Sequence, residues 1–194
     1  MTHLVDVVVD FGRDFAEKTG EPPVLLEFGV GCGSLSISVK KELPEAQVIG
    51  VDLDSDAIAV ARENAAFHHA DVLLVESDLF SDLPPEIVPD IVFGDPPWGD
   101  DDCIYDDDRP ASHYHAMPIL SAFPSGGITG LHEAILSDIA NRGWDCNVLL
   151  NLGILDGKPV ERLASMTRES EVFRFDKASV FRGIVATATD SGGL

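Results

Sequence analysis

Short apolar runs alternate along the chain with longer segments whose apolar residues recur at helical spacing. Continuous apolar runs are typical of strands buried on both faces of a parallel sheet, and the helical period indicates helices that cover such a sheet. The runs that predict strands cover residues 24–28, 48–52, 72–76, 91–94 and 147–152. The segments that predict helices cover residues 3–18, 34–42, 55–66, 131–141 and 159–166, with Ser55 as the N-cap of the third.

The last part of the pattern predicts how the sheet is completed. Residues 172–175 and 183–188 would form two closing strands, paired as an antiparallel hairpin at the sheet edge. We therefore expect an α/β fold with a doubly wound, Rossmann-like, mostly parallel seven-stranded sheet, whose ligands bind at the carboxyl ends of the strands. Residues 98–127 interrupt the alternation, and the length of this segment indicates a lid or substrate loop.

Composition adds limits to this picture. With 194 residues and no linker or repeat, we expect residues 1–194 to form a single domain. No apolar run is long enough to span a bilayer, and the start of the chain lacks the features of a signal peptide, so we expect a cytoplasmic protein without membrane contacts. The three cysteines are scattered, so neither a disulfide framework nor a zinc site is predicted.

The net charge restricts the partners. Asp and Glu total 34 against 13 Lys and Arg, which gives a net charge of −21. Such a charge repels a phosphate backbone over a broad surface, so a nucleic-acid substrate is disfavoured. The acidity has two explanations, adaptation to a salt-rich cytoplasm or attraction of a basic substrate, and the sequence leaves both open.

A glycine turn follows the first predicted strand and opens a helix. Its glycines are Gly29, Gly31 and Gly33, and the next residue is Ser34, where a dinucleotide-binding fingerprint would have glycine. Glycines at this place let the backbone approach a ligand closely. The turn alone is weak support for a ligand site.

Acidic residues at the ends of the first three strands strengthen that interpretation. Asp52 ends the second strand, where a carboxylate accepts hydrogen bonds from both hydroxyls of a ribose; Asp54 is the competing residue. Asp78, with Leu79 beside it, follows the third strand and would accept from an adenine amino group, unless it is a solvated turn residue. Glu27 precedes the glycines. Four acids around one turn suit a cationic sulfonium ligand better than a pyrophosphate.

A second motif follows the fourth strand and consists of Asp95, Pro96, Pro97 and Trp98. The prolines fix the backbone and remove two N–H donors, so the segment mainly offers acceptors. The Asp95 carboxylate and the Pro96 carbonyl would bind both hydrogens of an N–H₂ group and orient its lone pair, while Trp98 stacks on a planar substrate. If the acceptor is an amine, Asp95 also takes its proton.

The loop beyond this motif offers further candidates. Aspartates at 100–102 and 106–108 would attract a basic substrate, or they form a solvated loop. We predict that His113 and Tyr114, together with Pro97, contact the substrate. A one-residue spacing between His113 and His115 does not establish a metal site, and none is predicted.

Together these motifs resemble the class I S-adenosylmethionine-dependent methyltransferases, and most of all the HemK/PrmC group of protein glutamine-N5 methyltransferases. The similarity covers residues 24–166, including a Gly-Gly-x-x-Gly-Leu run at 126–131. The resemblance implies S-adenosylmethionine as the cofactor and S-adenosylhomocysteine as its product. It places Glu27, Gly29 and Gly31 at the methionine end, Asp52 at the ribose and Asp78 at the adenine.

Two positions depart from that group, whose second motif usually begins with Asn and ends with Tyr instead of Asp95 and Trp98. The bacterial release-factor enzymes also carry a helical recognition domain, which we do not expect in this chain. We therefore expect an N-methyltransferase acting on an amide or amine nitrogen of a small molecule or protein side chain, with or without a partner subunit. Adenine-N6 methylation of nucleic acid and a non-catalytic cofactor-binding subunit are the alternatives.

Overall fold

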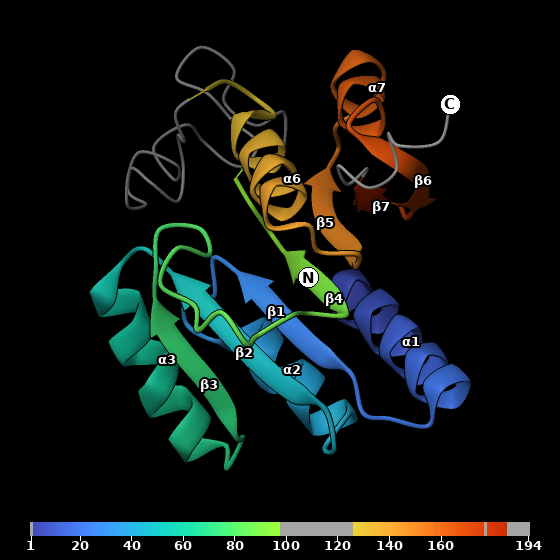
Figure 1. Cartoon of the computed structure of the whole chain (residues 1–194). Coiled ribbons are helices and arrows are strands. Elements are labelled where there is room, and N and C mark those ends of the chain that lie inside the picture. Colours follow the sequence, from blue (N-terminus) through green and yellow to red (C-terminus); the bar gives the residue numbers. More distant parts are fainter. Residues whose placement is uncertain (1, 98–125, 177, 186–194) are drawn as a thin grey trace.

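The computed structural model describes residues 2–97, 126–176 and 178–185, and these form a seven-stranded sheet with helices on both faces (Figure 1). The strands are β1 (Val24–Phe28), β2 (Gln47–Asp52), β3 (Val72–Glu76), β4 (Ile91–Gly94), β5 (Asn147–Gly153), β6 (Thr167–Arg174) and β7 (Ser179–Val185). The helices are α1 (Thr2–Thr19), α2 (Ser34–Glu42), α3 (Ser55–Phe67), α6 (Gly130–Arg142) and α7 (Lys158–Ala164).

The sheet has the strand order β3-β2-β1-β4-β5-β7-β6. Strands β1 to β5 pair in parallel, whereas β7 is antiparallel to both β5 and β6. The predicted doubly wound, mostly parallel sheet with an antiparallel edge hairpin is therefore confirmed. The order reverses between β1 and β4, and in open α/β sheets ligands bind at such a reversal, outside the carboxyl ends of the strands.

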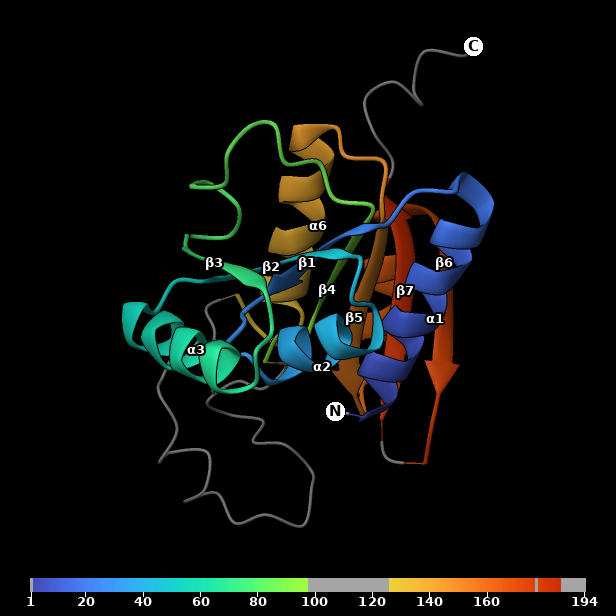
Figure 2. The ribbon, with the colours of Figure 1, turned by 90° about the horizontal axis from the view of Figure 1, so that it is seen from below.

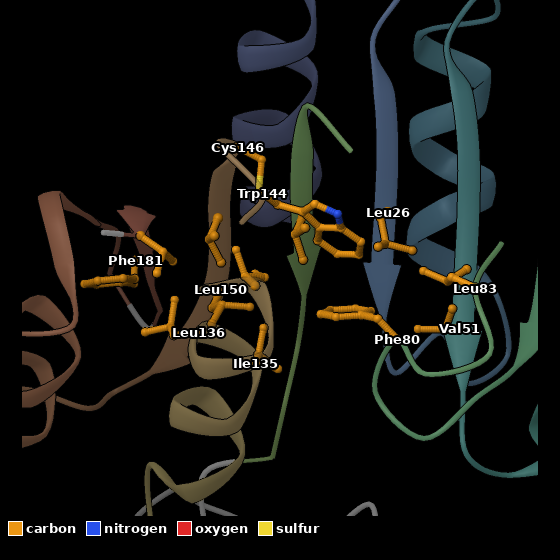
Figure 3. Close-up of a cluster of buried hydrophobic side chains, with 14 of the residues drawn as sticks. Leu26, Val51, Phe80, Leu83, Ile135, Leu136, Trp144, Cys146, Leu150 and Phe181 are labelled. Atoms are coloured by element: carbon orange, nitrogen blue, oxygen red, sulfur yellow. The ribbon is translucent and has the colours of Figure 1, made fainter. Parts of the chain in front are cut away.

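Helices α1, α2 and α3 cover one face of the sheet and α6 covers the other (Figure 2). On the first face, Leu4 and Val8 of α1 pack with Ile91 and Phe93 of β4. On the second face, Val92 of β4 belongs to the cluster that contains the buried side chains of α6, and Figure 3 shows Ile135 and Leu136 in that cluster together with Phe80 and Trp144. Both faces of β4 are thus buried, which explains its unbroken apolar sequence.

Three predictions about element ends were wrong. Strand β7 begins at Ser179, four residues before the predicted start at residue 183. The N-cap of α3 is Asp54 and not Ser55, because Asp54 has an extended backbone and its carboxylate accepts a hydrogen bond from the amide of Asp56 at 2.9 Å. Strand β6 begins well before residue 172, and its early residues are largely exposed because β6 is the edge of the sheet. An exposed edge strand lacks the apolar run on which the prediction relied.

Candidate active site

The carboxyl ends of four strands meet in one row. Phe28 of β1 pairs with Val51 of β2 and Gly94 of β4, and Gly94 pairs with Leu150 of β5. Because paired strands keep their register, the next residue on each strand lies beside its neighbours. These next residues are Asp52, Gly29, Asp95 and Asn151.

The glycine turn (residues 29–33) leaves open space on one side. Gly29 and Gly31 have φ values of +65° and +53°; a Cβ on Gly29 would meet nothing within 4 Å, and one on Gly31 only the Gly29 carbonyl oxygen at 4.0 Å. A Cβ on Gly33 would instead lie 3.3 Å from side-chain atoms of Ala61 and Ile37. Gly33 therefore allows the turn to pack on α2 and α3, while Gly29 and Gly31 offer bare backbone to a ligand.

Asp52 is held rigidly beside this turn. Its Oδ2 accepts a hydrogen bond from the Gly31 amide at 2.8 Å, and its Oδ1 accepts one from the Asp54 amide at 3.0 Å. A carboxylate oxygen can accept more than one hydrogen bond, so both oxygens retain capacity for ligand hydroxyls. Asp54, the competing residue in the sequence, is engaged as the cap of α3.

The segment after β3 lies against the end of β2. The Ser77 amide donates to the Asp52 carbonyl oxygen at 2.8 Å, and the Ser77 hydroxyl accepts from the Asp82 amide at 3.1 Å. Asp78 follows with an exposed side chain, and the half-buried Leu79 has a φ of +51°. Positive φ is costly for a residue with a branched side chain, and such strain often accompanies ligand sites.

Glu27 lies beneath the turn and is 1% exposed. Its Oε2 accepts hydrogen bonds from the amide of Ser36, at 2.8 Å, and from the Ser36 hydroxyl. Burial raises the pKa of Glu27 to about 8; the hydrogen bonds from Ser36 oppose this shift, whereas the charges of Asp52 and Asp95 add to it. The carboxylates of this site therefore lie close enough to interact, and together they favour a cationic ligand.

Asp95 is linked to a residue that sequence reasoning missed. The Asn151 side-chain amide donates from Nδ2 to Asp95 Oδ1 at 2.6 Å. Pro96 is buried and Pro97 half-buried. Asn151 interrupts the apolar sequence of β5 close to its carboxyl end, and a polar residue at that place was the signal that could have identified it.

The structure thus brings together Glu27, Gly29, Gly31, Asp52 and Asp95. The predicted site residues Trp98, His113 and Tyr114 lie outside the described residues, as does the acidic part of the loop. Within the described residues, no three His, Cys, Asp or Glu side chains gather as metal ligands would. None of the helices described is long and apolar enough to cross a bilayer.

Sequence comparison links the N-terminal half of the chain to known proteins. Residues 14–106 match the methyltransferase small domain family. The release factor glutamine methyltransferase of Geobacter sulfurreducens is 34% identical over 96 residues, which are 50% of this chain and 32% of that protein. The enzyme of the same name from Deinococcus radiodurans is 36% identical over 78 residues, which are 40% of this chain and 27% of that protein. The matches thus span about a third of the length of these curated relatives, and they confirm the predicted resemblance.

Structural comparison shows the fold. A class I S-adenosylmethionine-dependent methyltransferase from Listeria monocytogenes superimposes with a TM-score of 0.64 at 14% identity, covering 97% of this chain and 61% of that one. An RNA methyltransferase from Thermus thermophilus, solved with S-adenosylmethionine and guanosine, superimposes with a TM-score of 0.60 at 16% identity, covering 90% of this chain and 41% of that one.

Proposed function

We propose that this chain, whose residues 14–106 match the methyltransferase small domain family, is an S-adenosylmethionine-dependent N-methyltransferase. The observation that carries the proposal is the position of Asp95 at the carboxyl ends of the strands. Gly94 pairs with Phe28, so Asp95 lies beside Gly29, where the glycine turn begins. We favour a protein side-chain amide as the acceptor, since the relatives from Geobacter and Deinococcus are named for glutamine.

The residues at the carboxyl ends of the strands fit the cofactor. The spare hydrogen-bonding capacity of Asp52 suits the ribose hydroxyls, and the open side of Gly29 and Gly31 admits the methionine portion. Glu27 would pair with the ammonium group of that portion, and the exposed Asp78 would accept from the adenine amino group, with Leu79 at the same ring. When bound, S-adenosylmethionine supplies a methyl group activated by its cationic sulfur.

Asp95 and Pro96 would position the acceptor nitrogen. An amide or aryl amine nitrogen is a weak nucleophile because its lone pair is delocalised, so accepting both N–H hydrogens and fixing the direction of the lone pair contributes most of the rate. Asp95 offers a carboxylate, and the two prolines remove competing N–H donors. For an amine acceptor, Asp95 would also take the proton released on transfer. Trp98 stays our candidate for stacking on the substrate, and Pro97, His113 and Tyr114 for contacting it.

A matched pair of variants tests the assignment. Asp95 lies at the carboxyl end of β4, whereas Asp90 lies at the other end, where it accepts a hydrogen bond from the Val24 amide at 2.8 Å. We expect Asp95→Ala to reduce transfer of a tritiated methyl group by about 100-fold or more, with cofactor affinity in calorimetry nearly unchanged. Asp90→Ala, assayed below its melting temperature, should keep the activity. Loss of cofactor binding in Asp95→Ala equal to its loss of transfer would contradict the role.

The acceptor panel for the wild-type protein contains a glutamine-bearing release factor, the same factor with that glutamine replaced, small amines, RNA and DNA. Transfer that requires the glutamine supports the proposal. Transfer confined to RNA or DNA would favour adenine methylation instead, against the net charge of −21. Tight cofactor binding without transfer to any acceptor would favour a non-catalytic subunit.

A further inference from the structure

We propose that Asn151 is a positioning residue for the reaction: it holds one oxygen of Asp95 so that the other oxygen faces the acceptor nitrogen. This inference rests on the proposed function, because it concerns the same carboxylate. Three observations carry it, namely the orientation of the Asn151 amide, a bulge in β5 at this residue, and a buried histidine that contacts its backbone.

Hydrogen bonding determines the orientation of the Asn151 amide. The Gly153 amide can only donate, so the atom that faces it at 3.2 Å must be the oxygen of the Asn151 side chain. The nitrogen then faces Asp95 Oδ1 at 2.6 Å and donates to it. An ionised carboxylate accepts at both oxygens, and a hydrogen bond to a charged group is stronger than one between neutral groups. This bond fixes the orientation of the Asp95 carboxylate, and with it the direction of Oδ2, which we assign to the substrate.

A β-bulge in β5 aims the Asn151 side chain. Opposite β7, Asn151 pairs with Val180 and Gly153 with Ser179, so the register shifts between these two residues of β5. The Ser179 hydroxyl donates to the Gly153 carbonyl oxygen at 3.1 Å, and Gly153 has a φ of +54°. Bulges bend a strand and redirect a side chain, and they are common next to active sites. A regular strand would not give Asn151 the Gly153 amide as a partner.

His132 of α6 holds the Asn151 backbone from the other side. The ring is fully buried, and its Nε2 lies 3.2 Å from the Asn151 carbonyl oxygen. Burial lowers the pKa of His132 to about 4, so the ring is neutral at physiological pH. A carbonyl oxygen only accepts, so Nε2 carries the proton. The first turn of α6 therefore fixes the position of Asn151, and through it that of Asp95.

The decisive variant is Asn151→Asp, which replaces the donor by a second carboxylate. Two carboxylates at this distance share one proton at low pH, and that proton restores a hydrogen bond, whereas at high pH they repel each other. Among the described residues, Glu27 on β1 interacts with the charges of Asp95 and of Asp52 on β2, and His132 on α6 contacts the Asn151 backbone. Since Glu27 itself titrates, the quantity to compare is the kcat of the variant divided by that of the wild type at each pH.

We expect this ratio to fall by about 100-fold between pH 5.5 and pH 8.5, while the affinity for S-adenosylmethionine changes little. The matched control is Asn147→Asp, the same change at the other end of β5, where the side chain accepts from Arg182 at 3.0 Å. The control should keep a flat ratio. An Asn151→Asp ratio near one at every pH, or a fall in both variants alike, would overturn the proposal.

Exchanging Asp95 and Asn151 separates the effect of the pair on folding stability from its effect on the rate of methyl transfer. In Asp95→Asn/Asn151→Asp a donor again faces a carboxylate, so the unfolding equilibrium constant at pH 8 should return to within about threefold of the wild-type value. Transfer should recover in part, because the amide oxygen at residue 95 can still accept from the acceptor nitrogen while its NH₂ group donates to residue 151. An exchanged variant as unstable as the single variants would overturn the proposal.

If the wild-type protein binds the cofactor but methylates nothing, the proposed function is refuted, whereas the pairing of Asp95 with Asn151 is not. The unfolding measurements on the single and exchanged variants would then still decide whether Asp95 and Asn151 act as a pair. Absence of energetic coupling between the two substitutions would refute the pairing itself.

Discussion

Replacing Glu27 by Gln is expected to stabilise the folded protein at neutral and alkaline pH. The reason is the burial of this carboxyl group, which is 1% exposed and whose pKa burial raises from 4.5 to about 8. Gln has nearly the same shape, and its carbonyl oxygen can accept both hydrogen bonds from Ser36. The substitution therefore removes the cost of burying a charge and keeps the packing.

The sign and size of the effect follow from proton linkage. The pKa of Glu27 is higher in the folded than in the unfolded protein, so its contribution is fully present below pH 4.5 and is lost as pH rises to about 8. One pKa unit corresponds to about 1.36 kcal/mol, so the loss is about 3 kcal/mol at pH 7 and about 5 kcal/mol above pH 8. A neutral Gln undergoes no such loss.

Urea unfolding of both proteins at pH 5, 6, 7, 8 and 9 measures the difference. We expect the free energy of unfolding of Glu27→Gln to exceed that of the wild type by an amount that is below about 1 kcal/mol at pH 5 and grows until about pH 8. Glu45→Gln, a change at an exposed glutamate, should give a pH-independent difference. Parallel curves for Glu27→Gln and the wild type would refute the reasoning, as would a less stable variant at pH 8.

The same variant should bind S-adenosylmethionine less well, by about tenfold, if Glu27 pairs with the ammonium group. Binding of a cation favours the ionised carboxylate, so the wild-type affinity should rise with pH up to about 8, whereas the affinity of the variant should lack this component. Calorimetry over the same pH series measures both. A gain in stability without a loss of affinity would show that Glu27 serves the fold alone.

Three further perturbations test other parts of the structure. Asp52→Asn leaves one carbonyl oxygen for the two amides of Gly31 and Asp54, so we expect cofactor affinity in calorimetry to fall by about 10–100-fold; an unchanged affinity would remove Asp52 from the site. Gly94→Ala places a Cβ 2.6 Å from the Phe28 carbonyl oxygen, so unfolding should require about 2–3 kcal/mol less in urea, and a wild-type midpoint would contradict this close contact. Raising NaCl from about 0.05 to 0.5 M shortens the Debye length from about 14 to about 4 Å, which should increase the melting temperature of a protein of net charge −21 by about 3 °C or more; a constant melting temperature would show that self-repulsion is unimportant.

Local sequence was enough to predict most of the elements. The strands 24–28 and 91–94 have the predicted bounds, because strands buried on both faces are continuously apolar and end at turn residues. The edge strand 72–76 and the helix 34–42 also have the predicted bounds. The edge strand β6 was only partly predicted, since edge residues such as Glu169 and Glu171 are exposed and carry no apolar pattern. The cap of α3 was misplaced by one residue, because Asp54 and Ser55 both suit a cap and only the backbone conformation distinguishes them.

The sequence by itself determined which residue types stand at the ends of strands, and with them the glycine turn, Asp52 and Asp95. Only the tertiary structure decided which strand ends are neighbours: β4 lies beside β1, and β5 beside β4, so Asp95 meets Asn151 across 56 positions of the chain. The burial of Glu27 and the bulge that aims Asn151 are likewise absent from the local pattern. The physical reason is that hydrophobic periodicity depends on the few residues around each position, whereas strand order, register and desolvation depend on contacts between residues far apart in sequence.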